Sequence, residues 1–223
     1  MNLKFFLELI PEKFRYKISD FRGRGEYSFF ANEYQTIFIH IPKTGGSSVA
    51  KSLFDQSSRH VPWFEYYKYN KMKYNKFFKF AFVRNPWDRL VSSYFYLRNG
   101  GMNKMDNDWA LENIKQYETF QEFVLRWVNK KNINSWIHFK PQNYWICDDK
   151  KNIMIDYLGR LETISRDFLF ISNKVGSKKF LDKLNKSERG KYQSYYNLET
   201  KEIVEKVYHD DVKLFGYSFN DFE

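Results

Sequence analysis

The sequence predicts an α/β fold: a single domain with a central parallel β-sheet flanked by helices. A chain of 223 residues is long enough for one well-buried domain and short for two. Segments that alternate like strands are followed by segments with helical spacing, and the turns between them are short. No linker-like change of composition divides the chain. We therefore treat residues 1–223 as one domain, in which residues 1–33 form an N-terminal extension.

The first four elements follow one another from strand to helix, twice. Residues 34–41 alternate and are rich in Ile and Phe, which predicts a buried strand. Residues 47–54 continue at helical spacing, and residues 79–83, KFAFV, predict a second strand. Pro86 is expected to begin the next helix, because a proline at the first helical position loses no hydrogen bond. Two further helices are predicted, over residues 109–129 and 199–214.

The net charge of +10 is unevenly distributed along the chain. Residues 59–89 contain eight Lys or Arg against two Asp or Glu, and residues 174–191 contain seven against two. A single charge run usually forms a solvated face, but two such runs around a glycine-rich turn favour an anion-handling surface. Nucleic acid is one candidate anion, although the sequence has no helix-turn-helix, zinc-finger or RNP signature.

Cysteine content and the N-terminal segment bear on the cellular compartment. Cys147 is the single cysteine, so no disulfide forms within the chain, and we expect it to be a buried apolar residue. The segment MNLKFFLELIPEKFRYK is interrupted by Glu8 and Pro11, and it lacks the ~20 apolar residues of a membrane-spanning helix. We expect a soluble cytoplasmic protein, with a Golgi-lumenal location only if an anchor is missing from this sequence.

The stretch PKTGGSS, residues 42–48, predicts an anion-binding turn between the first strand and the first helix. Its two glycines allow a tight turn, and free backbone N–H groups at the helix start point toward a ligand. The two serines add hydroxyl donors, and Lys43 supplies a mobile positive charge. An ordinary Ser-capped turn would explain GGSS alone. The preceding Pro-Lys-Thr, in its strand–helix context, favours the functional interpretation.

A second motif, FAFVRNPWDRLVSSY, covers residues 80–94. Arg84 ends the second strand, and Ser92 follows eight residues later in the next helix. A planar guanidinium can grip a phosphate dianion and a serine can cap it. The alternative is a structural pair between Arg84 and Asp88. Two anion sites at adjacent strand ends are the stronger interpretation, because α/β folds bind nucleotides at the carboxyl edge of the sheet.

Both stretches resemble the donor-binding motifs of sulfotransferases that use 3′-phosphoadenosine 5′-phosphosulfate (PAPS). IFIHIPKTGGSSV is similar to the 5′-phosphosulfate-binding loop, and FAFVRNPWDRLVSSY is similar to the 3′-phosphate-binding motif. The stretches HFKPQNYWI, IDYLGRLETISRDF and VYHDDVKLFGY resemble later signatures of the carbohydrate sulfotransferases, of Golgi and bacterial type. The resemblance thus covers residues 36–217.

The resemblance implies a P-loop-like domain that moves a sulfonate from PAPS to an acceptor hydroxyl by in-line displacement, without a required metal. Lys43 is implied to reach the bridging oxygen and the sulfonate, while residues 44–48 hold the 5′-phosphate. Arg84 and Ser92 are implied to hold the 3′-phosphate. A later loop that closes over the donor, or a solvated turn, is indicated at residues 186–187. The implied donor-binding residues are Lys43, Thr44, Gly45, Gly46, Ser47, Ser48, Arg84, Ser92, Lys186 and Ser187.

The acceptor hydroxyl needs a base, and the chain has four histidines. His60 lies between the two donor motifs, where related enzymes place a catalytic histidine, so it is the expected base. His138 is the alternative base, or else lines the acceptor groove, and Glu65 is the fallback. His40 is expected to be packed within the first strand, and His209 to be exposed on the last helix.

The resemblance implies a carbohydrate acceptor, such as an acidic polysaccharide. Trp63, Trp136 and Trp145 suit stacking on sugars, although burial in the core is an equal alternative. We expect no nucleic-acid partner and leave the oligomeric state open.

Three other functions could use an anion-binding turn or the positive charge. A P-loop kinase would need Gly-x-x-x-x-Gly-Lys-Ser/Thr and an acidic magnesium ligand at a strand end, and neither is seen. A basic nucleic-acid- or nucleotide-binding protein without sulfotransfer activity would use the positive charge but has no need of the Lys43 loop. A donor-binding protein that has lost catalysis is the third.

Overall fold

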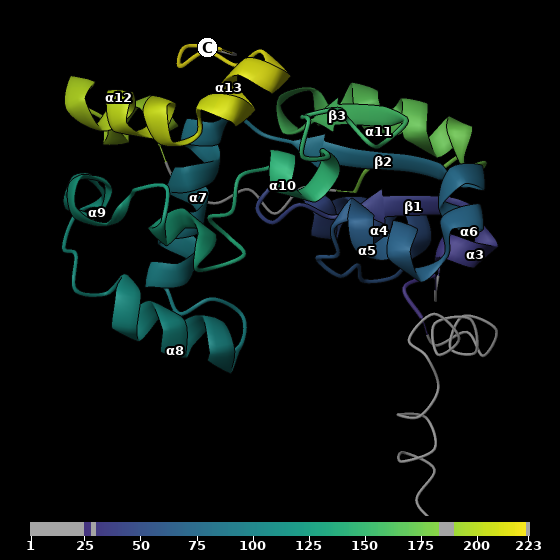
Figure 1. The fold of residues 1–223 in the computed structure, drawn as a ribbon, viewed down its shortest axis with the longest axis horizontal. Coiled ribbons are helices and arrows are strands. Elements are labelled where there is room, and N and C mark those ends of the chain that lie inside the picture. Colours follow the sequence, from purple (N-terminus) through teal and green to yellow (C-terminus); the bar gives the residue numbers. More distant parts are fainter. Residues whose placement is uncertain (1–24, 28–29, 183–189, 222–223) are drawn as a thin grey trace, which may run out of the picture.

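The chain folds around a parallel β-sheet flanked by helices, as the sequence predicts (Figure 1). The structure is a computed structural model, and it describes residues 25–27, 30–182 and 190–221. Within these residues the sheet has three strands in the order β1-β2-β3, and both neighbouring pairs are parallel. The strands are β1 (Thr36–Ile39), β2 (Phe78–Val83) and β3 (Tyr157–Arg160).

Helices make up most of the remaining structure. The α-helices are α3 (Phe30–Glu33), α4 (Gly46–Phe54), α5 (Trp63–Tyr69), α6 (Lys71–Lys76), α7 (Pro86–Arg98), α8 (Lys104–Asn113), α9 (Phe120–Trp127), α10 (Asn143–Ile146), α11 (Ile164–Lys174), α12 (Leu198–Val207) and α13 (His209–Phe215). Short 3-10 turns cover Asn132–Asn134, Leu161–Thr163 and Tyr192–Tyr195. No described helix combines the length and hydrophobicity needed to cross a bilayer.

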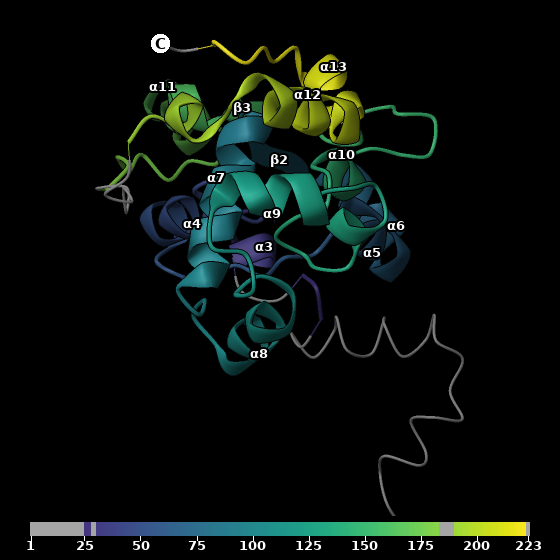
Figure 2. The same ribbon diagram turned by 90° about the vertical axis from the view of Figure 1, so that its left-hand side faces the viewer.

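Two apolar clusters form the core of the described residues, and helix α7 belongs to the second. The first surrounds the sheet, where the buried rings of Phe38 on β1 and Phe80 on β2 stack 4.8 Å apart. The second joins α7, α8, α9 and α12 around buried aromatic side chains such as Tyr94 and Phe123. Figure 1 shows the sheet on the right and this helical cluster on the left, and Figure 2 shows α7 and α9 in front of the sheet. The carboxyl end of β2 leads directly into α7, so this edge of the sheet faces the helical cluster.

The elements beside the anion-binding turn lie where the sequence predicts them. Strand β1 is shorter than residues 34–41, and α4 begins one residue early, at Gly46. Helix α7 begins at Pro86, and the side chain of Asn85 caps it by accepting a hydrogen bond from the Trp87 amide. Strand β3 was not predicted from periodicity.

Both long predicted helices are wrong in length, because each is divided. The segment 109–129 contains the end of α8 and all of α9, since the Thr119 hydroxyl accepts from the Glu122 amide and caps a new helix. The segment 199–214 is divided at Tyr208, which leaves helical geometry between α12 and α13. The Tyr208 hydroxyl donates to the buried carbonyl of Phe139 at 2.7 Å and so anchors this break.

Candidate active site

The PKTGGSS turn joins β1 to α4 through two left-handed residues. Lys43 has φ 68° and Gly45, which caps α4, has φ 80°. The Thr44 hydroxyl donates to the Ile41 carbonyl at 2.9 Å, and Thr44 is fully buried. The Thr44 side chain is therefore occupied within the turn. Among the predicted anion-binding residues, Ser47 is exposed in the first turn of α4.

Gly46 lets α4 lie directly against His40. A Cβ atom at residue 46 would lie 2.1 Å from the His40 ring, so no other residue fits without a shift of the packing. His40 follows β1, is buried as expected, and its Nδ1 shares a 2.8 Å hydrogen bond with the Ser58 hydroxyl. Burial lowers the pKa of His40 well below its usual value, so the ring is neutral at pH 7.

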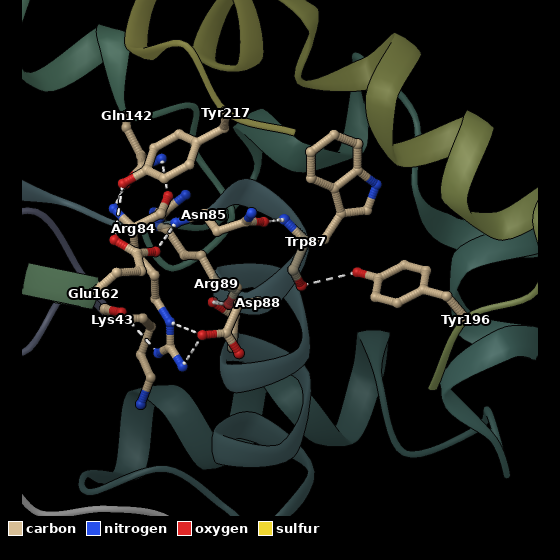
Figure 3. A network of polar contacts seen from close by, with 11 residues as sticks. Lys43, Arg84, Asn85, Trp87, Asp88, Arg89, Gln142, Glu162, Tyr196 and Tyr217 are labelled. Atoms are coloured by element: carbon tan, nitrogen blue, oxygen red, sulfur yellow. Dashed lines mark hydrogen bonds and ion pairs between the residues drawn. The ribbon is translucent and has the colours of Figure 1, made fainter. Parts of the chain in front are cut away.

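Arg84, at the end of β2, links the two predicted donor motifs (Figure 3). Its Nη1 donates to the Lys43 carbonyl at 3.1 Å, while its Nε and Nη2 contact Asp88 at 2.8 and 2.7 Å. The Arg84–Asp88 pair that the sequence left as an alternative is thus present. Ser92 lies two helical turns farther along α7 and is half-buried.

Buried polar side chains also hold the backbone of Arg84, in the turn between β2 and α7. The backbone N–H and carbonyl of Arg84 both bond to the Gln142 side chain, at 2.9 and 2.8 Å. The Asp211 carboxylate in turn accepts from the amides of Gln142 and Asn143 at 2.6 and 2.9 Å. These contacts join β2, α10 and α13, and the sequence analysis missed all of them because the partners are far apart in the chain.

Glu162 braces the same turn. Its carboxylate accepts from the Asn85 amide at 2.6 Å and from the Tyr217 hydroxyl at 3.0 Å (Figure 3). Burial raises the pKa of Glu162 despite these hydrogen bonds. The turn after β2 is therefore fixed by the end of β3 and by the chain segment after α13.

His60 lies against the start of the turn with a defined tautomer. Its Nδ1 is 2.8 Å from the His40 carbonyl, which only accepts, so Nδ1 carries the proton and Nε2 keeps its lone pair. The His60 and His40 ring centroids are 4.2 Å apart. Burial lowers the pKa of His60, and the charges of Arg89 and Lys43 add to this effect. A neutral imidazole with a lone pair on Nε2 can accept a proton at pH 7.

His138 is more deeply buried, with 5% of its surface exposed. Its Nε2 lies 3.2 Å from Oδ1 of Asp106, and its ring centroid is 6.3 Å from that of His60. Burial lowers the pKa of His138 to about 4. The other ring nitrogen, Nδ1, is buried and has no hydrogen-bond partner within the described part of the chain. His138 is thus a buried neighbour of His60.

The Lys43 ammonium lies over the ring of Tyr96, 3.9 Å from its centroid. The Tyr96 hydroxyl donates to Oδ2 of Asp106 at 2.7 Å. Burial raises the pKa of Tyr96 to about 12, and this hydrogen bond adds to the shift. Helix α7 therefore contributes an aromatic contact to the lysine that leads the turn.

Arg89 is a further buried cation that the sequence analysis did not single out. Its Nε donates to the Pro42 carbonyl and its Nη1 to the Lys140 carbonyl, both at 2.9 Å. The side chain therefore braces the PKTGGSS turn against the segment that follows His138. Arg89 and Lys79 are both buried, so the basic run at residues 59–89 is only partly a surface.

The tryptophans considered for sugar stacking differ in burial and contacts. Trp63 is half-buried, and its Nε1 donates to the Cys147 carbonyl at 2.8 Å. Trp145 is buried in the core, and Cys147 is buried as expected. Trp136 stacks on Trp109 with centroids 5.0 Å apart.

The other predicted site residues are placed as follows. Glu65 is half-buried on α5, and His209 is exposed on α13. Lys186 and Ser187 lie outside the described residues.

Comparisons with known proteins identify a family for the chain. The model of the sulfotransferase family matches residues 27–218. An uncharacterized protein of Archaeoglobus fulgidus is 26% identical over 122 residues, which cover 54% of this chain and 85% of that protein. No solved structure matches the chain.

Proposed function

The chain belongs to the sulfotransferase family, and we propose that it moves a sulfonate from PAPS to a hydroxyl group of a carbohydrate acceptor. The observation that carries this proposal is the contact between the two donor motifs. Arg84 at the end of β2 donates to the carbonyl of Lys43 in the turn after β1. One nucleotide spanning these two strand ends would meet both motifs, as in other parallel α/β sheets.

The PKTGGSS turn supplies what a 5′-phosphosulfate needs. Backbone N–H groups at the start of α4 and the exposed Ser47 offer donors to the phosphate. Lys43 offers a cation to the oxygen that bridges phosphorus and sulfur. That oxygen gains negative charge when its bond to sulfur breaks, and a charge placed there is typically worth ~3 kcal/mol in the transition state.

Proton transfer can be assigned to His60. The acceptor oxygen attacks sulfur in line, the bond to the 5′-phosphate breaks, and adenosine 3′,5′-bisphosphate leaves. The acceptor proton passes to Nε2 of His60, whose Nδ1 proton is held by the His40 carbonyl. His60 is half-buried and His138 is buried, which favours His60 as the group that meets the acceptor.

The surface beside His60 suits a sugar. The Trp145 ring contacts the rings of both His60 and Tyr144, whose centroids are 6.2 and 5.3 Å away. Tyr144 is 36% exposed, packs against Phe64, and carries the Lys140 ammonium 4.3 Å from its ring centroid. Exposed aromatic rings stack on sugars, and a lysine can pair with their acidic groups. We therefore propose an acidic polysaccharide as the acceptor. The half-buried Trp63 and the buried His138 are proposed to support this surface from within.

The experiment is transfer of labelled sulfonate from PAPS across a panel of acidic and neutral polysaccharides. Label in at least one polysaccharide, in step with release of adenosine 3′,5′-bisphosphate, is the expected result. Nucleotide binding without transfer to any hydroxyl would indicate a donor-binding protein without catalysis. Tight binding of nucleic acid with no nucleotide binding would favour the basic nucleic-acid-binding alternative.

A further inference from the structure

Asp106, on α8, is a buried carboxylate that four side chains approach at once. Its exposed fraction is 3%. Oδ2 accepts from the Tyr96 hydroxyl at 2.7 Å and from the side-chain Nδ2 of Asn103 at 2.9 Å. Oδ1 accepts from Nε1 of Trp136 at 3.0 Å and faces Nε2 of His138 at 3.2 Å. Such a dense set of donors on one carboxylate exceeds what a helix start needs, since Asn103 alone caps α8.

Two of these contacts lead directly to the proposed reaction. Through Tyr96, Asp106 holds the ring over which the Lys43 ammonium lies. Through His138, it holds the imidazole 6.3 Å from His60. Because Oδ1 only accepts, the His138 proton is on Nε2 and the buried Nδ1 is left as an acceptor.

We propose that Asp106 is a positioning residue of the sulfonate transfer, which orients Lys43 through Tyr96 and the His60–His138 pair through His138. This inference rests on the proposed function. Asp106 also supplies negative charge near His60, where an imidazolium forms when the acceptor proton arrives. The Asp106 charge favours the protonated form of His60, whereas the Arg89 and Lys43 charges oppose it.

The charged and titratable groups around the pair come from several elements. The turn after β1 contributes Lys43 and His40, α7 contributes Arg89 and Tyr96, and α8 contributes Asp106. Replacing Asp106 leaves both cations in place. The acidic limb of the pH–rate profile should therefore move to lower pH while the maximal rate falls.

Asp106→Asn is the main test variant, because the amide keeps the size of the carboxylate but places an NH₂ group against at least one donor. Turnover should fall at least about tenfold, as part of the ~10²- to 10⁴-fold contribution of a positioned base. Affinity for adenosine 3′,5′-bisphosphate should stay within about twofold, because Asp106 contacts neither Arg84 nor the backbone N–H groups at the start of α4, which are proposed to hold the phosphates.

A second variant separates the effect of Asp106 on Lys43, through Tyr96, from its effect on His60, through His138. Tyr96→Phe keeps the ring beneath Lys43 but removes the hydroxyl that reaches Asp106. It should lower turnover without moving the acidic limb as far as Asp106→Asn does, because His138 keeps its partner.

The matched control is Asp167→Asn. Asp167 is equally buried and accepts from the Tyr157 hydroxyl, the Thr163 hydroxyl and the Arg160 amide, but on α11. It should lose stability to a similar extent with an unchanged pH profile. If Asp106→Asn and Asp167→Asn each lose turnover and nucleotide affinity together, Asp106 has a structural role only and the inference is overturned.

Nitrogen NMR of the histidine rings gives a readout that does not depend on activity. We expect the His138 proton on Nε2 in the wild type, with His138→Gln used for assignment, and a shift toward Nδ1–H in Asp106→Asn. A wild-type proton on Nδ1, or full turnover in Asp106→Asn, overturns the inference. If the wild type binds no donor and transfers nothing, the proposed function fails, while the NMR result still decides whether Asp106 fixes the His138 tautomer.

Discussion

Lys43 combines a left-handed backbone with an ammonium group that lies against the Tyr96 ring. Left-handed geometry costs a non-glycine residue ~1–2 kcal/mol, and the Arg84 bond to the Lys43 carbonyl helps to hold it. The turn thus keeps a strained residue at the position where a sulfonate donor would need a cation. Strain of this kind is common at functional sites.

Lys43→Ala should lower sulfonate transfer by a factor of ~100 to 1,000, because it removes a charge that stabilises the leaving oxygen. Transfer rates at saturating donor measure this effect. Lys51→Ala is the control, since Lys51 is an exposed lysine on α4 that pairs with Asp55. Unchanged turnover in Lys43→Ala would remove Lys43 from the mechanism.

The pH dependence of transfer should report on His60. A base must be neutral, so activity rises with pH through the His60 pKa. Since burial lowers that pKa, the rise should lie below the ~6.5 of free imidazole and the rate should be flat near pH 7. A pH–rate profile between pH 4.5 and 8 checks this.

His60→Ala should lose ~10²- to 10⁴-fold in transfer and still bind the nucleotide. His138→Ala should lower turnover less than His60→Ala does, because the buried His138 positions the base and does not itself accept the acceptor proton. A His60→Ala variant with near-normal turnover, beside a His138→Ala variant that loses it, would reverse the two assignments.

At the scale of elements, the approach of α4 to β1 depends on the contact between Gly46 and His40. Gly46→Ala places a methyl group 2.1 Å from the His40 ring and should lower the free energy of unfolding by ~1–3 kcal/mol. Thermal or urea unfolding measures it. In the His40→Ala background the same change should cost much less.

Gly216→Ala is the control, because Gly216 has φ 60° and no atom within 4 Å of the added Cβ. Its cost is backbone strain alone and should not depend on His40. Equal losses for Gly46→Ala with and without His40 would show that the ring contact does not govern this turn.

The junction of β2 and α7 depends on Arg84. Arg84→Ala should weaken donor binding by ~1.5–3 kcal/mol if the guanidinium contacts the 3′-phosphate. The loss should then disappear for a nucleotide that lacks the 3′-phosphate, as measured by calorimetry. If it persists, Arg84 acts through Asp88 and the Lys43 carbonyl alone.

For the whole molecule, local patterns predicted the elements whose signals lie within one segment. Strands β1 and β2, the turn between β1 and α4, and the start of α7 at Pro86 all follow from spacing and capping. Strand β3 has only four residues, and three of them are half-buried, so no clear alternation marks it. Its place in the sheet comes from pairing with β2.

The polar contacts around the site could not be predicted in this way. The partners of Asp106 come from α7, the residue before α8 and the segment before α10, and Gln142 meets Arg84 across 58 residues. Only Asn103, three residues before Asp106, leaves a local signal, since that spacing resembles a helix cap. Which side chains meet at the sheet edge is decided by tertiary packing of the two clusters.

The central claim is that the turn after β1 and the end of β2 form one donor site for PAPS. Isothermal titration with adenosine 3′,5′-bisphosphate, in EDTA and in magnesium, tests it most directly, with adenosine 5′-phosphate as the comparison. We expect micromolar affinity that is independent of magnesium, and at least about tenfold weaker binding without the 3′-phosphate, as for loss of a charge-assisted contact. No binding, or equal affinity for the two nucleotides, would contradict it.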